Sequence, residues 1–294
     1  MSTSEIETCG RYVDVGDTRL YVVERGRGYP LLVFHGGPGL DHHEFGDYLD
    51  ALADEYRLIL VDERGQGRSD RAQEDTWTLR QMAADVGSLA RALGLKRYAA
   101  LGHSYGAFVV LQHAVDFPGD AAQTIVSSGI PSARFLEHVA HNLAAFEPVE
   151  LRERVAGSWD RERFVRTPEE VAELLHDQLP FHFADPRDPR IEEYERRTAG
   201  SIYSPDVLRR FASEEYGAIE VEDRLRDVTQ PTLVLAGRHD RVCSVEAARA
   251  IAEGVQRGEL VVFESSGHTT FVEEDEAYIR SVRRFLRRHA GSGS

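Results

Sequence analysis

Short apolar runs alternate with amphipathic stretches in the first and last thirds of the chain. Continuous runs such as Leu31–Phe34 and Leu58–Val61 are typical of strands that are buried on both faces. Apolar positions spaced by three and four residues predict a helix over residues 78–94. This alternation predicts an α/β fold in which helices cover both faces of a mostly parallel sheet.

The same alternation resumes at Pro231 and continues to the last helix. Further apolar runs predict strands over residues 19–23, 98–101, 124–126, 232–236 and 260–263. Amphipathic patterns predict helices over residues 246–253 and 275–288. The last helix is acidic at its start and basic at its end, an order that complements the helix dipole.

Residues 132–215 interrupt the alternation of strands and helices. They hold helix-like segments and many aromatic residues but no buried strand, and Pro180, Pro186 and Pro189 are expected to break the helices. We interpret this segment as a helical cap inserted into a core formed by residues 1–131 and 216–290. A run of ordinary core helices is the alternative. Residues 291–294 (Gly-Ser-Gly-Ser) are expected to form a flexible tail.

Charge and composition narrow the possible partners. The 294 residues carry a formal net charge of −15, which disfavours nucleic acid and anionic membranes. No apolar run approaches the roughly 18 residues that span a membrane. The N-terminus lacks the pattern of a signal peptide, so we expect a cytoplasmic protein. The two cysteines, Cys9 and Cys243, suggest neither a disulfide framework nor a metal site, and composition does not reveal the oligomeric state.

A candidate nucleophile lies at the centre of residues 102–106, which have the form G-x-S-x-G between two apolar runs. In such an elbow a strand turns sharply into a helix and exposes the serine hydroxyl above the sheet. Small residues two positions before and after the serine let the backbone make this turn. Ser104 is therefore the candidate nucleophile.

A serine hydroxyl needs a base to take its proton and an acid to orient that base. His268 and Asp240 each follow the end of a predicted strand, as Ser104 does, so all three are expected at one edge of the sheet. Nucleophile, acid and base follow one another along the chain in an order known for such triads. Asp62 also ends a strand and is the competing acid.

A glycine-rich loop at residues 35–39 (His-Gly-Gly-Pro-Gly) follows the strand that ends at Phe34. Acyl transfer develops negative charge on a carbonyl oxygen, and backbone N–H groups can stabilise that charge. The expected donors are the N–H groups of Gly37 and Tyr105. A phosphate cradle is the alternative, but the loop has neither G-x-G-x-x-G nor G-K-[ST].

These motifs resemble the α/β-hydrolase superfamily over essentially the whole chain, and within it the proline iminopeptidases and related aminopeptidases. The resemblance rests on H-G-G-P-G at 35–39, D-E-R-G-Q-G-R-S at 62–69, the elbow at 102–106, G-R-H-D at 237–240 and S-G-H at 266–268. It implies a serine hydrolase that releases an N-terminal residue, preferably proline, from short peptides or amides. No metal or cofactor is implied.

The resemblance also implies acidic residues near the cap that bind the free N-terminal ammonium of the substrate. Glu214 and Glu215 are the candidates for this role, and Trp159 is a further candidate for contact with the substrate. One position departs from some members of the family, because Arg241 follows Asp240 where they have an acidic residue.

Two other functions stay open at this point. A carboxylesterase or lactonase would act on small apolar esters, with the aromatic cap supplying the pocket. A non-catalytic protein would use the same fold to bind a small-molecule ligand.

Overall fold

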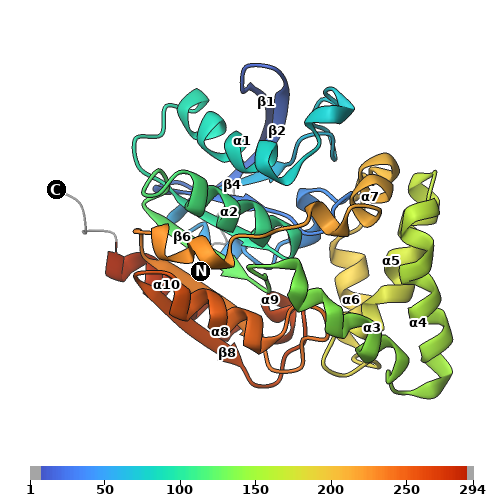
Figure 1. Ribbon diagram of the computed structural model, residues 1–294. Helices are drawn as coiled ribbons and strands as arrows, with labels where there is room; N and C mark the ends of the chain where they lie inside the picture. Colours follow the sequence, from blue (N-terminus) through green and yellow to red (C-terminus); the bar gives the residue numbers. More distant parts are fainter. Residues whose placement is uncertain (1–7, 290–294) are drawn as a thin grey trace, which may run out of the picture.

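The computed structural model describes residues 8–289, which are built around an eight-stranded sheet (Figure 1). The strands are β1 (Thr8–Asp14), β2 (Arg19–Arg25), β3 (Tyr29–Phe34), β4 (Tyr56–Asp62), β5 (Ala99–His103), β6 (Gln123–Ser127), β7 (Thr232–Gly237) and β8 (Gly258–Phe263). Their spatial order is β1-β2-β4-β3-β5-β6-β7-β8. β2 pairs antiparallel with β1 and β4, and the other neighbours are parallel. The predicted α/β fold is confirmed; the predicted tail at 291–294 lies outside the described residues.

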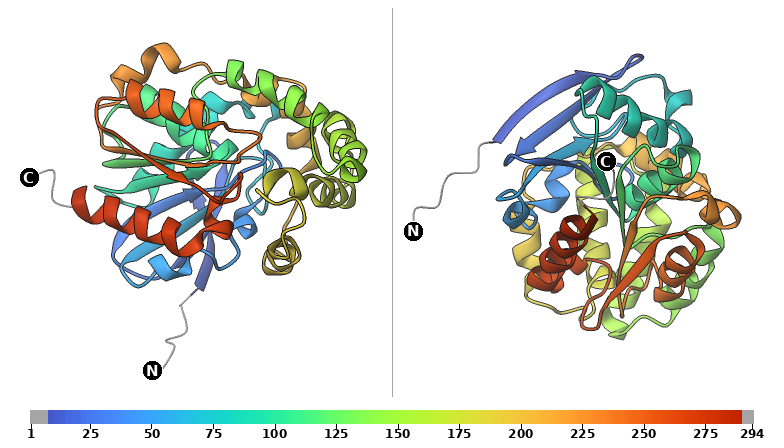
Figure 2. Two further views of the ribbon diagram at one scale, coloured as in Figure 1. Left: turned by 90° about the horizontal axis from the view of Figure 1, so that it is seen from below. Right: turned by 90° about the vertical axis from the view of Figure 1, so that its left-hand side faces the viewer.

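Helices cover both faces of the sheet (Figure 2). The helices α1 (Leu79–Ala92), α2 (Tyr105–Asp116) and α8 (Val245–Gly254) pack on one face, and α10 (Asp275–His289) packs on the other. Alternate side chains of β3 point to opposite faces of the sheet. Leu32 and Phe34 lie in the apolar core that contains α1, α2 and α8, and Leu31 and Val33 lie in the core that contains α10. The sheet is therefore buried on both faces, as its continuous apolar runs require.

Between β6 and β7 the chain forms helices at one side of the sheet (Figure 1). These are α3 (Glu137–Ala144), α4 (Val149–Arg161), α5 (Pro168–His182), α6 (Arg190–Arg197) and α7 (Pro205–Ala212). Within the described part of the chain, residues 132–215 contribute no strand to the sheet. The division into a core and a cap stays a prediction, and we call residues 132–215 the cap segment.

Pro180 does not break a helix as predicted, because it lies inside α5. A proline removes one backbone N–H and so leaves the carbonyl four residues earlier without its helical partner. That residue, His176, is exposed, and α5 ends two residues after the proline. The helix therefore loses one hydrogen bond near its end and continues.

None of the helices among residues 8–289 combines the length and the apolar character needed to cross a lipid bilayer.

Candidate active site

Ser104 occupies a strained turn between β5 and α2. Its φ of 52° and ψ of −117° are rare for a residue with a side chain and store free energy in the backbone. A Cβ atom on Gly102 would lie 2.0 Å from the carbonyl oxygen of Gly106, and one on Gly106 would lie 2.4 Å from that of Phe34. Both positions therefore need glycine. The Ser104 N–H donates to the Ser127 carbonyl (2.9 Å), which ties the elbow to β6.

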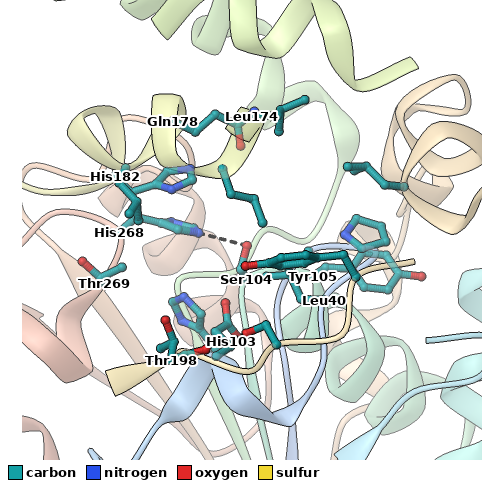
Figure 3. Close-up of a pocket in the computed structure, with 18 of the residues that line it drawn as sticks. Leu40, His103, Ser104, Tyr105, Leu174, Gln178, His182, Thr198, His268 and Thr269 are labelled. Carbon is teal, nitrogen blue, oxygen red and sulfur yellow. Dashed lines mark hydrogen bonds between the residues drawn. The ribbon is translucent and has the colours of Figure 1, made fainter. Parts of the chain in front are cut away.

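His268, in the loop after β8, lies between the serine and the acid, and Figure 3 shows its hydrogen bond to Ser104. Its Nε2 lies 2.9 Å from Ser104 Oγ, and its Nδ1 lies 2.9 Å from Asp240 Oδ2. The other oxygen of Asp240 accepts the N–H groups of Val242 and Cys243, each at 2.8 Å. The structure thus brings the three predicted residues into one chain of hydrogen bonds.

Asp62, the competing acid, serves a different part of the molecule. Its Oδ1 accepts the ring Nδ1–H and the backbone N–H of His42 at 2.5 Å and 3.0 Å, and its Oδ2 accepts the N–H of Arg68 at 2.8 Å. These bonds hold together the loops after β3 and β4, and Asp62 is not among the residues that line the cavity.

Burial and the neighbouring charges act in opposite directions on the pKa values of this pair. Desolvation alone would lower the pKa of His268, but Asp240, together with Glu44 and Glu273, holds that pKa above its ordinary value. Desolvation would raise the pKa of Asp240, but His268 and the N–H groups of Cys243 and Val242 hold it below its ordinary value. The pair is therefore arranged to stabilise a protonated imidazole, which a base becomes when it takes a proton.

Two further histidines pack against the His268 ring. The ring of His103 lies 5.0 Å from it and that of His182, at the end of α5, lies 5.1 Å from it, between centroids (Figure 3). Desolvation lowers the pKa of both, that of His182 to about 3. Both are therefore neutral near pH 7 and add no charge next to His268. Sequence reasoning missed His182, because no motif marks it.

The two predicted oxyanion donors face the cavity. Gly37 and Tyr105 both line it, and neither N–H donates to an acceptor within residues 8–289. The preceding N–H, that of Gly36, is already bound by Oε2 of the buried residue Glu44 at 2.5 Å. The arrangement leaves the N–H groups of Gly37 and Tyr105 available to a developing oxyanion.

A cavity of about 330 Å³ opens above Ser104. Its wall is mostly apolar and is largely supplied by the cap segment, with Leu174 and Gln178 of α5 facing the serine (Figure 3). Trp159 lines the cavity, in the region where the sequence analysis expected it. Its indole Nε1 is buried and has no acceptor among the described residues. The wall thus offers mainly apolar contact.

Glu214 and Glu215 were predicted to bind a substrate ammonium, but the structure places both on the surface. The Glu214 carboxylate lies 3.6 Å from the Arg210 guanidinium, and neither glutamate lines the cavity. Left-handed φ angles at Glu215 (50°) and Tyr216 (53°) turn Tyr216 inward, which leaves both glutamates outside. This local turn has no sequence signature.

The buried carboxyl groups that line the cavity are those of Glu44 and Glu162; the partly exposed Glu195 also lines it and pairs with His176 at 2.6 Å. Glu162 accepts hydrogen bonds from Gln178 Nε2 (2.6 Å) and from the hydroxyl of Tyr216. Burial raises the pKa of Glu44 and of Glu162 to about 7. Each carboxyl can thus be charged or neutral near neutral pH, and a bound cation would favour the charged form.

Within residues 8–289, one group of side chains outside the cavity has the spacing of metal ligands: Asp41, His42 and His43. Both histidines already engage carboxylates through Nδ1, at 2.5 Å to Asp62 and 2.8 Å to Asp41. Asp41 also accepts the N–H groups of His43 and Ile202. These bonds explain the cluster as the link between the loop after β3 and the end of the cap segment.

Comparison with known proteins shows to which family this chain belongs. The profile of the alpha/beta hydrolase fold matches residues 29–275. The chain belongs to the alpha/beta hydrolases. Relatives of this hydrolase include the proline iminopeptidases of Clostridium botulinum and Heyndrickxia coagulans, each 26% identical to it over 90% of this chain and 92% of their own. The predicted resemblance to proline iminopeptidases is confirmed.

Solved structures agree with the fold of the hydrolase. Proline iminopeptidase from Mycobacterium smegmatis superposes with a TM-score of 0.75 at 25% identity, over 96% of this chain and 98% of that one. An esterase from Exiguobacterium antarcticum superposes with a TM-score of 0.76 at 23% identity, over 95% and 100%. At that identity the esterase supports the shared fold only.

Proposed function

We propose that this hydrolase uses Ser104 as a nucleophile and releases an N-terminal residue, preferably proline, from short peptides or amides. One observation carries the proposal: Ser104, His268 and Asp240 form an unbroken chain of hydrogen bonds beneath a cavity that a buried carboxyl also lines. The relatives named proline iminopeptidase support this substrate class.

The proposed reaction follows from the positions of these groups. His268 Nε2 takes the proton of Ser104 Oγ as the oxygen attacks the substrate carbonyl, and Asp240 stabilises the imidazolium that forms. The N–H groups of Gly37 and Tyr105 stabilise the oxyanion. His268 then gives its proton to the leaving amine, and an acyl-enzyme remains.

Water completes the proposed cycle. His268 takes a proton from a water molecule, which attacks the acyl carbonyl and releases the acid and free Ser104. Proton transfer and oxyanion stabilisation both come from protein groups in this scheme, so we expect full activity in the presence of a metal chelator. The expected substrate is a small molecule or a short peptide.

The cavity supports an acyl group of modest size with a free amine. Its volume of about 330 Å³ and its apolar wall suit a proline ring, and Trp159 lies on that wall. Glu162 offers a buried carboxylate to an ammonium, an interaction that is stronger than a neutral hydrogen bond. Arg241 does not oppose it, because its guanidinium binds backbone carbonyls of the cap segment and does not line the cavity.

A carboxylesterase or lactonase acting on small apolar esters is the second candidate. It is favoured by the apolar wall and by the bonds of Gln178 and Tyr216 to Glu162, which already satisfy both oxygens of that carboxyl.

A substrate panel separates the candidates. We expect proline 4-nitroanilide with a free amine to be cleaved at least about tenfold faster, in kcat/KM, than its N-blocked form. Ser104→Ala should lower every rate by about a thousandfold or more. Cleavage of simple 4-nitrophenyl esters alone would replace the peptidase proposal with the esterase. A wild type that neither cleaves the panel nor reacts with a fluorophosphonate probe would favour a non-catalytic ligand-binding protein.

A further inference from the structure

The loop that carries the base is bound to the cap segment through its backbone. The N–H of His268 donates to the carbonyl of His182 at 2.6 Å. A Cβ atom on Gly267 would lie 2.4 Å from that same oxygen and 2.8 Å from the nitrogen of Ala184. The two backbones are therefore in direct contact, with no side chain between them.

A buried carboxylate joins the same two segments. Glu273 accepts the N–H of Ala184 through Oε1 at 2.7 Å. Through Oε2 it accepts the N–H of Gly267 at 2.8 Å and the hydroxyl of Thr269 at 3.1 Å. One side chain thus fixes the residues on both sides of His268 relative to the end of α5.

Arg241 binds the same part of the cap segment, residues 181–184. Its guanidinium donates to the carbonyl oxygens of Phe181 (3.2 Å), Phe183 (2.6 Å) and Ala184 (3.1 Å). These carbonyls lie at the C-terminus of α5, where the helix dipole favours a cation. Arg241 directly follows Asp240, so the loop of the acid and the loop of the base are both attached to residues 181–184.

We propose that Arg241 is a positioning residue, which holds residues 181–184 against the base loop and thereby keeps the His268 ring between Ser104 and Asp240. The proposal rests on the role proposed above for His268. Displacement of residues 181–184 would move the acceptor of the His268 N–H and the His182 ring that packs on the base. In this proposal, Arg241 has a function at the position where some members of the family have an acidic residue.

An arginine suits this role better than a lysine. The planar guanidinium presents five N–H donors in a fixed fork and reaches three carbonyls at once. A lysine ammonium is a compact group on a flexible stem. Arg241→Lys should therefore restore part of what Arg241→Ala removes.

The test compares wild type, Arg241→Ala, Arg241→Lys and Arg238→Ala. Arg238 is the matched control, because it lies in the same loop but pairs with Glu264 on the surface at 2.7 Å. The rate of Ser104 labelling by a fluorophosphonate probe is measured for each, together with kcat and KM for the substrate of the panel that is cleaved. Circular dichroism and thermal melting report whether each variant is folded.

Misplacement of a catalytic group by a fraction of an ångström to 1 Å lowers rates steeply, so Arg241→Ala should lower labelling and kcat by about 30-fold. KM should stay within about threefold, because the cavity wall is intact. Arg241→Lys should recover part of the rate, and Arg238→Ala should match wild type. Wild-type labelling by a folded Arg241→Ala, a loss confined to KM, or an equal loss in Arg238→Ala would each overturn the proposal.

Two safeguards keep the outcome interpretable. If Arg241→Ala does not fold, Arg241→Lys and Glu273→Gln carry the test, since each weakens the same attachment and should slow labelling; wild-type rates in both overturn the proposal. Absence of labelling in the wild type itself would instead refute the proposed function, because it would remove the nucleophile on which the inference rests.

Discussion

Three neighbours determine the state of Glu162: a hydroxyl from Tyr216, an amide from Gln178 and an apolar wall. The two donors stabilise the carboxylate, while burial favours the neutral acid and raises the pKa to about 7. A small change in the surroundings, such as the arrival of an ammonium, is therefore enough to fix the charge. This balance makes Glu162 the residue on which recognition of a free amine can be tested.

Glu162→Gln keeps the shape of the side chain and removes its charge. A hydrogen bond to a charged group contributes about 1.5–3 kcal/mol, so the preference for free over N-blocked proline anilide should fall about 10–100-fold. The ratio of kcat/KM for the two substrates measures it. Glu215→Gln is the control, because that side chain is exposed and lies outside the cavity. An unchanged ratio in Glu162→Gln would speak against amine binding at this residue.

Single residues could be predicted from the sequence where a local motif marks them. Ser104, Asp240 and His268 each follow a strand, so the register of a parallel sheet brings them together. Glu162 could not be found in this way, because it reaches the cavity through the packing of the cap segment and the turn at Tyr216. The prediction that Glu214 binds the substrate failed for the same reason, since spacing along the chain does not show which side of an irregular turn faces inward.

At the scale of the element, α5 is the helix that contributes several of the side chains lining the cavity. It brings Gln178 and His182 to the cavity, and its first turn is closed by a capping box. Thr167 Oγ1 accepts the N–H of Glu170 at 3.2 Å, and the Glu170 carboxylate accepts the N–H of Thr167 at 3.2 Å. The start of the helix is thus fixed far from the residues that it positions.

Thr167→Ala should lower the free energy of unfolding by about 1 kcal/mol, because it leaves the N–H of Glu170 without its cap. Urea denaturation measures this change. Thr167→Ser keeps a hydroxyl at the same position and should retain most of the stability. Equal stability of Thr167→Ala and wild type would show that α5 does not depend on its cap.

Helices and strands with a regular spacing of apolar residues were predicted from the sequence, whereas the edge strand β1 was not. The helix expected over residues 78–94 is α1, which begins after Thr78, whose side chain accepts the N–H of Gln81. Strand β1 has neither an apolar run nor a regular alternation, and it forms because β2 offers it a ladder of backbone partners. Such a strand depends on its neighbour more than on its own residues.

For the whole molecule, burial shifts the pKa values of two sets of titratable groups in opposite directions. Among the described residues, burial raises the pKa of five carboxyl groups: those of Glu44, Glu162 and Glu273 to about 7, that of Glu63 well above its ordinary value, and that of Asp85 above its ordinary value. Burial lowers the pKa of three histidines: His35, His103 and His182. The carboxyls bind protons more tightly in the folded than in the unfolded chain, and these histidines bind them less tightly.

The sign of the pH dependence follows from this difference. The histidines destabilise the fold as pH drops below about 6.5, and the carboxyls destabilise it as pH rises from about 4.5 through 7. Between about 4.5 and 6.5 the two sets oppose each other, and above about 6.5 the carboxyls act together with His268, whose pKa is raised. Thermal melting should therefore show a lower midpoint at pH 8 than at pH 6.5.

Substituting two of the carboxyls tests the cause of this decline. A Glu44→Gln, Glu162→Gln double variant should lose part of the difference between pH 6.5 and pH 8, since each carboxyl contributes at most about 1.4 kcal/mol per pH unit. A midpoint that rises toward pH 8 in the wild type would contradict the argument.

The layered architecture of the whole molecule was predictable because buried parallel strands and amphipathic helices each leave a periodic signal. A cap at the site was expected, but the way it attaches to the core was not predictable, since it depends on contacts such as those of Arg241 and Glu273 with residues 181–184. These contacts join residues far apart in the chain, and no local sequence pattern predicts them.

The backbone contact at Gly267 limits how this enzyme could be redesigned. A chimera that exchanged the entire cap segment for that of a relative would replace the carbonyl of His182, on which the N–H of His268 rests. The foreign segment would have to present its own carbonyls to Arg241 at matching positions. A graft that ends before residue 181 would exchange part of the cavity wall, and one that keeps residues 181–184 as native sequence within it would exchange more. Either would leave the backbone contact of His268 unchanged.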